Sequence, residues 1–147
     1  MPNVLVIHGA GMNMRGKTQL DLFGPLTLDD YNKRIEGYAR DLKLGLRIFH
    51  SNIEGEVVNA LYAAHDGGVD VAVINPSAYM NGAPALLNAV RQVRFPIIEV
   101  HTSNPEARGI HSVFAPVARG LIYGFGLFGY YLALQAARDL AEQAKPK

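Results

Sequence analysis

Cysteine is missing from all 147 residues of the chain. Its absence excludes a disulfide scaffold, a thiolate nucleophile and a zinc site built on cysteine sulfur. A chain without cysteine suits a reducing compartment, and we therefore expect a cytoplasmic protein.

An excess of charge and a long apolar run are missing as well. The 14 basic residues are matched by 13 acidic ones, so there is no electrostatic case for binding nucleic acid or an anionic membrane.

No basic segment followed by an apolar one opens the chain, so we expect no signal peptide. The one stretch close to the roughly 18 residues of a membrane span, residues 120–137, is interrupted by four glycines. Its pattern predicts a strand, a turn and a helix, and we expect no contact with a membrane.

Short apolar runs that are β-branched or alternating predict five strands. These runs cover residues 3–7, 44–50, 69–75, 96–100 and 120–123. Apolar residues at helical spacing predict helices between them. The first helix opens at Thr27, a good N-cap residue followed by two aspartates. The others run from a cap at Ser51 or Asn52 to Asp66, over about residues 84–93 and over about residues 128–143.

Strands that alternate with helices favour an α/β fold built on a parallel sheet. At this length we expect one domain over residues 1–147. A flavodoxin-like, doubly wound sheet of five parallel strands, with helices on both faces and right-handed crossovers, fits the pattern.

Ligands of such sheets bind beyond the carboxyl ends of the strands. Asn75 ends one predicted strand and His101 directly follows another. Thr102, Ser103 and Arg108 lie in the loop after His101. Amides, hydroxyls and a guanidinium at this edge predict a site for a small anion. A plainer interpretation remains open for each residue, because Asn-Pro and Ser-Asn-Pro segments also form turns and cap short helices.

Residues 11–18 match the phosphate-binding pattern G-x-x-x-x-G-K-[ST] in full. The context is against a nucleotide site, because Gly24-Pro25 would break the helix that should follow Lys17 and Thr18. We expect this segment to be a mobile lid over the site. No two histidines have helical metal-binding spacing and no acidic cluster completes a site, so we expect neither a metal nor another cofactor.

Several segments together resemble the type II 3-dehydroquinate dehydratases. They are Ile74-Asn75-Pro76, Glu99-Val100-His101 with Ser103-Asn104, Ala107-Arg108, His111-Ser112, Ser51-Asn52-Ile53-Glu54-Gly55-Glu56, and Pro116-Val117-Ala118-Arg119-Gly120 with Gly124-Phe125-Gly126 and Gly129-Tyr130. The resemblance extends from residue 3 to about residue 137.

The resemblance implies an anti elimination of water from a cyclic hydroxy ketone acid. A lid tyrosine activated by an arginine removes a proton, and a histidine protonates the leaving hydroxyl. It assigns His101 as the general acid and Glu99 as the group that orients it. Asn75, Thr102 and Ser103 would bind the substrate carboxylate, and Arg108 matches an arginine of the loop. The resemblance also implies a homo-oligomer in which trimers assemble into a dodecamer.

The chain departs from the family pattern in the other half of this mechanism. The lid tyrosine falls on Phe23, the lid arginine on Thr18 and an enolate-steadying asparagine on Gly11. Two further substrate-binding positions, a histidine and an aspartate in the family, fall on Asn81 and Asn88. The nearby groups that could substitute for the missing ones are Arg15, Lys17 and Tyr79.

Three interpretations follow. The first is a hydro-lyase-type enzyme of this family that acts on a small, possibly cyclic, carboxylate and is inefficient on 3-dehydroquinate. The second is a 3-dehydroquinate dehydratase with a substitute base such as Tyr79. The third is a non-catalytic carboxylate-binding protein on the same scaffold. Glu99 beside His101 favours an enzyme, because a binding module has little need of an oriented histidine.

Overall fold

A computed structural model describes residues 1–145 of the chain. Its centre is one sheet of five parallel strands in the order β2-β1-β3-β4-β5. The strands are β1 (Asn3–Ala10), β2 (Gly45–His50), β3 (Val71–Ser77), β4 (Ile97–His101) and β5 (Gly120–Tyr123). This architecture confirms the predicted doubly wound α/β fold.

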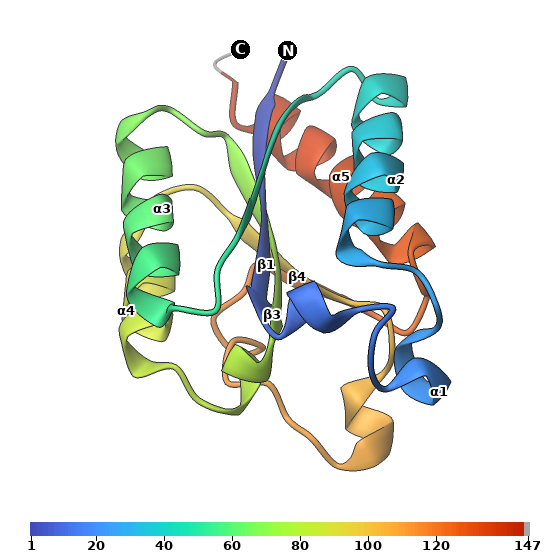
Figure 1. Ribbon diagram of the computed structural model, residues 1–147. Coiled ribbons are helices and arrows are strands. Elements are labelled where there is room, and N and C mark those ends of the chain that lie inside the picture. The colour runs from blue at the N-terminus through green and yellow to red at the C-terminus, as the bar shows by residue number, and fades with distance from the viewer. Residues whose placement is uncertain (146–147) are drawn as a thin grey trace.

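Helices cover both faces of the sheet. Four of them form the layers seen in Figure 1, with α2 (Leu28–Asp41) and α5 (Phe128–Gln143) on one face and α3 (Glu54–Asp66) and α4 (Pro84–Gln92) on the other. The short elements follow strand ends at the lower edge of the view. They are η1 (Met12–Met14) and α1 (Leu20–Phe23) after β1, η2 (Ala78–Asn81) after β3 and η3 (Pro105–Arg108) after β4.

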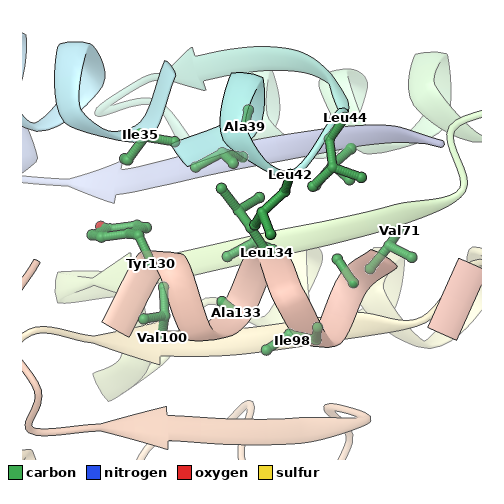
Figure 2. Close-up of a cluster of buried hydrophobic side chains, with 14 of the residues drawn as sticks. Ile35, Ala39, Leu42, Leu44, Val71, Ile98, Val100, Tyr130, Ala133 and Leu134 are labelled. Atoms are coloured by element: carbon green, nitrogen blue, oxygen red, sulfur yellow. The ribbon is translucent and has the colours of Figure 1, made fainter. Parts of the chain in front are cut away.

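Each face of the sheet has its own apolar core, because successive side chains of a strand point to opposite faces. In β1, Val4 and Val6 belong to the core under α2 and α5, whereas Leu5 and Ile7 belong to the core under α3 and α4. Figure 2 shows the first of these cores, in which side chains from α2, α5 and the strands gather in one cluster. Burial on both faces explains why the central strands β1, β3 and β4 are largely apolar in sequence.

The strands reach further toward the predicted site than the sequence suggested. β1 continues to Ala10 and β3 to Ser77. Gly9 allows this, since a Cβ atom there would lie 1.9 Å from the carbonyl oxygen of Pro76 on the neighbouring strand. The two strands therefore stay in contact up to the edge where ligands of such sheets bind.

The predicted cap of α3 is wrong. The N-cap residue is Ile53, and it makes no side-chain capping bond. Asn52 is engaged elsewhere, because its Oδ1 accepts from the backbone N–H of Gly11 at 2.8 Å. Ser51 instead accepts from the N–H of Ile53 at 2.9 Å. Asn52 thus ties the glycine-rich loop to the start of α3.

Within the part of the chain that the structure describes, no helix has both the length and the apolar character to cross a membrane.

The predicted cap of α2 is present and testable. Thr27 Oγ1 accepts from the N–H of Asp30 at 3.2 Å, and the Asp30 carboxylate accepts from the N–H of Thr27 at 3.0 Å. Thr27→Ala should lower the free energy of unfolding by about 1 kcal/mol, measured by urea denaturation. Thr27→Ser keeps the hydroxyl and should cost less than half as much, and equal losses in the two variants would contradict a capping role.

Candidate active site

A pocket of about 280 Å³ opens at the carboxyl edge of the sheet. Arg15 and Phe23 contribute from the segment after β1, Ser77 from the end of β3, and His101, Ser103 and Arg108 from the end of β4 and the loop beyond it. Parallel strands explain this convergence, because their carboxyl ends all meet at one edge.

His101 is held against a buried carboxylate. Its Nε2 lies 2.6 Å from Oε2 of Glu99, and both side chains are buried. The two residues lie two positions apart on β4, so their side chains point to the same face of the sheet. With Nε2–H donated to Glu99, Nδ1 of the imidazole carries the lone pair available to a ligand. The contact has the geometry that the predicted orienting role of Glu99 requires, and the role itself stays a prediction.

Arg15 is a buried cation with no acidic partner. Its guanidinium carbon lies 3.6 Å from the centre of the Phe23 ring. None of the ion pairs formed within residues 1–145 includes Arg15, and its Nε has no hydrogen-bond partner there. Burial lowers the pKa of Arg15, and the neighbouring Tyr31 and Tyr130 partly offset that shift. A carboxylate in the pocket would supply the missing counter-charge.

Ser103 and Arg108 lie together at the mouth of the pocket. Arg108 Nη1 donates to Ser103 Oγ at 3.2 Å, and the Arg108 side chain is exposed. The plainer interpretation of this loop also holds, since Asn104 caps η3 by accepting from the N–H of Glu106. The loop therefore has a structural cap and, next to it, two groups placed for an anion.

Asn75 is buried and does not line the pocket. Its Nδ2 donates to the Tyr130 hydroxyl at 3.1 Å, and its Oδ1 accepts from the N–H of Ser77 at 3.2 Å. The Tyr130 hydroxyl lies 3.4 Å from Nδ1 of His8, whose Nε2 lies 2.9 Å from Oδ1 of Asn32. These bonds form one chain of neutral groups in the core. The predicted contact between Asn75 and a carboxylate would require this chain to rearrange.

The remaining predicted site residues lie outside the pocket. Thr102 lines a second hollow behind Phe23, together with Tyr31. Lys17 and Asn88 are exposed. Asn81 is also exposed, and its Nδ2 donates to the carbonyl oxygen of Ala78. Contacts of Asn81 or Asn88 with a ligand stay predictions.

Tyr79 is not placed to act as a base in this pocket. Its hydroxyl donates to the carbonyl oxygen of Ser51 at 3.2 Å, in the core under α3 and α4. Burial raises the pKa of Tyr79, and the nearby Glu54 and Glu56 raise it further. A phenol with a raised pKa stays protonated at neutral pH, which disfavours proton abstraction.

Several pocket residues were not predicted from the sequence, among them Ser77 and Met80. Ser77 adopts φ 51°, a backbone conformation that costs energy for a residue with a side chain. Met80 supplies an apolar wall. The Asn75-Pro76 pair predicted a turn in this segment. It did not predict the strained backbone conformation of the next residue, Ser77.

The phosphate-loop pattern does not have its usual structure. The helix after Lys17 and Thr18 begins at Leu20 and ends at Phe23, and Gly24 follows with φ 78°. Among residues 1–145, no group of three or more His, Cys, Asp or Glu side chains is arranged to hold a metal ion.

These features define a doubly wound α/β protein with a pocket at the carboxyl edge of its sheet. A histidine bound to a carboxylate and a buried arginine line that pocket. The family model of the class II dehydroquinases matches residues 2–138. A 3-dehydroquinate dehydratase from Pseudomonas savastanoi pv. phaseolicola is 41% identical over 150 residues, which cover 99% of this chain and all of the relative. One from Bacillus licheniformis is 42% identical over 137 residues, covering 91% of this chain and 94% of the relative.

Solved structures agree with this match. The type II dehydroquinase from Butyrivibrio crossotus superimposes with a TM-score of 0.88 at 32% identity, covering 93% of this chain and 97% of that one. The chain belongs to the class II dehydroquinase family. The predicted family is confirmed, as is the prediction of a lyase-type enzyme related to the 3-dehydroquinate dehydratases.

Burial of His8 predicts a loss of stability in acid. Burial, together with the charges of His50 and Arg15, lowers the pKa of His8 from 6.5 to about 4, although the bond to Asn32 opposes the shift. Below pH 6.5 the unfolded chain therefore binds a proton that the folded chain does not, and stability falls as the pH drops toward 4. The contribution of His8 to this loss is at most about 3 kcal/mol.

Urea denaturation between pH 7.5 and 4 should show a smaller loss for His8→Asn than for the wild type. His111→Asn, which changes an exposed histidine, should follow the wild type. Parallel curves for the wild type and His8→Asn would contradict the assignment.

Because the buried Arg15 has no acidic partner, we predict that its charge lowers the free energy of unfolding of the ligand-free protein. Arg15→Met removes the charge but keeps an unbranched side chain over Phe23. Without ligand, the free energy of unfolding should stay the same or rise by up to about 3 kcal/mol, because a buried charge without a partner is costly. Arg108→Met, at an exposed position, should change it by less than about 0.5 kcal/mol. A loss above 1 kcal/mol in Arg15→Met would show that the cation is satisfied within the fold.

Proposed function

We propose that the protein is a hydro-lyase that acts on a small, possibly cyclic, carboxylate with His101 as its acid–base group. The observation that carries this proposal is the set of ionisable side chains that line the pocket, namely Arg15, His101 and Arg108. Two cations favour an anionic ligand, and a single acid–base group defines the chemistry.

The pocket supports an elimination in which one imidazole moves both protons. Arg15 and Arg108, with the Ser103 hydroxyl, hold the carboxylate. The neutral Nδ1 of His101 takes the proton from the carbon next to the carbonyl, and the electron pair forms an enolate. The same nitrogen then gives its proton to the leaving hydroxyl, so that a double bond forms, water leaves and His101 is neutral again. Glu99 holds the ring in place through Nε2 during both steps.

This arrangement favours elimination on one face of the substrate and makes 3-dehydroquinate a poor substrate. The anti elimination that the family resemblance implies needs a base on the face opposite the general acid. Phe23 occupies the position of the lid tyrosine and cannot accept a proton. Loss of a positioned base typically costs about 10²–10⁴-fold in rate, so we expect slow turnover of 3-dehydroquinate.

A 3-dehydroquinate dehydratase with a substitute base is the second candidate. The observation in its favour is the 41% identity with a 3-dehydroquinate dehydratase over 99% of this chain. Tyr79 is a poor choice of base for the reasons given above. Tyr31 is better placed, because it neighbours Arg15 and lines the hollow behind Phe23.

A carboxylate-binding protein without catalysis is the third candidate. It requires Arg15 and Arg108 but gives no role to the buried Glu99. Burying a carboxylate is costly unless it is paired, and here its partner is the one acid–base group of the pocket. The pair therefore supports an enzyme over a binding module.

We further propose that the protein works in the cytoplasm as a homo-oligomer of trimers assembled into a dodecamer. Exposed apolar side chains on β5 and around the start of α5 support an assembly. Leu121 is 46% exposed, Phe125 60% and Phe128 52%. Large apolar groups gathered in one region of a surface are typical of interfaces.

The decisive experiment measures formation of the conjugated enone from 3-dehydroquinate by the wild type, Phe23→Tyr and His101→Ala. Phe23→Tyr adds a hydroxyl to the ring over which the Arg15 guanidinium lies. This variant should turn over 3-dehydroquinate roughly 10²-fold faster than the wild type, because it restores a phenol beside a cation. Phe23→Leu is the matched control and should give no gain. His101→Ala should abolish turnover in every background.

Each alternative gives a different result in this assay. Efficient turnover by the wild type that collapses in Tyr31→Phe would establish the second candidate. For the third candidate, neither the wild type nor Phe23→Tyr would react, yet 3-dehydroquinate and cyclohexanecarboxylate would stabilise the wild type against heat. The uncharged cyclohexanecarboxamide should not stabilise it, and Arg15→Met should lose the effect of both acids.

A further inference from the structure

Tyr123 is the residue of β5 that stands next to His101. The two residues are register partners on the neighbouring strands β4 and β5. Their rings meet edge to face, with centroids 4.8 Å apart and planes at 86°. The Tyr123 ring therefore packs against the imidazole from the neighbouring strand β5.

The same neighbourhood contains two buried polar atoms without partners. Oε1 of Glu99 and the hydroxyl of Tyr123 are both buried, and neither has a hydrogen-bond partner among residues 1–145. The other oxygen of Glu99, Oε2, is the one that binds His101. Both side chains contact the His101 ring. Buried polar atoms are nearly always paired in native proteins, so these two free atoms are candidates for a bond to each other.

The charge of Glu99 acts on the Tyr123 phenol. Burial raises the pKa of Tyr123, and the Glu99 carboxylate raises it further, while Ser112 opposes the shift. The phenol consequently keeps its proton at neutral pH and can serve only as a donor to a carboxylate. Ser112 is the competing partner, although its Oγ already accepts from the N–H of Phe114 at 3.2 Å.

We propose that Tyr123 is a positioning residue whose hydroxyl donates to the free oxygen of Glu99 and thereby fixes the carboxylate that orients His101. Three residues then act in series. Tyr123 holds Glu99, Glu99 holds Nε2 of His101, and Nδ1 is left to face the ligand. Such support matters because a carboxylate bound through one oxygen can rotate about its last bond, and the imidazole would turn with it.

This inference deepens the proposed function, and its kinetic consequence rests on that function. Its structural consequence does not, because the geometry of the His101 ring can be read without any substrate. The primary measurement is therefore the ¹⁵N and ¹H NMR signal of the His101 ring in the full-length protein. The Nε2 proton of the wild type should appear far downfield and exchange slowly with water, as expected for a bond of 2.6 Å.

Tyr123→Phe keeps the ring against His101 and removes only the hydroxyl. In this variant the Nε2 proton should exchange roughly tenfold faster, as expected for the loss of one hydrogen bond. Tyr131→Phe is the matched control, since it removes a hydroxyl from a tyrosine that packs against Tyr38 away from the site, and it should leave the signal unchanged. An unchanged signal in Tyr123→Phe, with the protein folded, would overturn the proposal.

Two further variants separate a positioning role from other causes. In Glu99→Ala, the additional change Tyr123→Phe should have no effect on the His101 signal, because the side chain that links the two residues is gone. If Ser112→Ala reproduced the effect of Tyr123→Phe, the serine would be the true partner and the proposal would fail.

For any carboxylate that the wild type turns over, Tyr123→Phe should lower kcat about tenfold and change KM less than twofold. A protein without turnover would contradict the proposed function alone, and the NMR result would still decide the role of Tyr123.

Discussion

The parallel register of the strands is the constraint on which the site depends. It places His8 beside Asn75 and His101 beside Tyr123 at one edge of the sheet. Polar groups that are buried at such an edge cost free energy unless they bind one another, since water cannot reach them. Two sets of polar contacts result. One joins Asn75, Tyr130 and His8 through neutral groups, and the other joins His101 to the carboxylate of Glu99.

The distribution of charge around the pocket follows from these contacts. Glu99 is the buried carboxylate at this edge, and it faces His101 rather than Arg15. Arg15 is consequently buried over Phe23 without a counter-charge. A cation held in this way costs stability in the free protein, but it needs little reorganisation when an anion arrives, and pre-organised charge of this kind is what active sites use. The fold thus pairs Glu99 with His101 and leaves Arg15 without a counter-charge among residues 1–145.

Much of the fold could be predicted from local pattern. The strand at Gly120–Tyr123 and the helix at Phe128–Gln143 have the predicted bounds, and Thr27 caps α2 as its type and position indicate. The strand ends also located His101 and Glu99. The sequence could not show that Asn75 turns to Tyr130, or that Asn52 binds Gly11 instead of capping α3, because both bonds join residues that are more than 40 positions apart. Arg15 was one of several candidate lid groups, and only its burial distinguishes it from the exposed Lys17.

His8 and His101 show why the residue type at a strand end does not decide its role. Both histidines are buried and both end at the same edge of the sheet. His8 binds only neutral groups, and burial holds its pKa near 4, so at neutral pH it stays uncharged and belongs to the polar contacts of the core. His101 has a carboxylate on one nitrogen and the pocket on its other side. Helices α2 and α5 supply the neutral partners of His8, whereas Glu99, two residues earlier on the same strand, supplies the carboxylate that binds His101. This difference in partners, and not the residue type, makes His101 the candidate for acid–base chemistry.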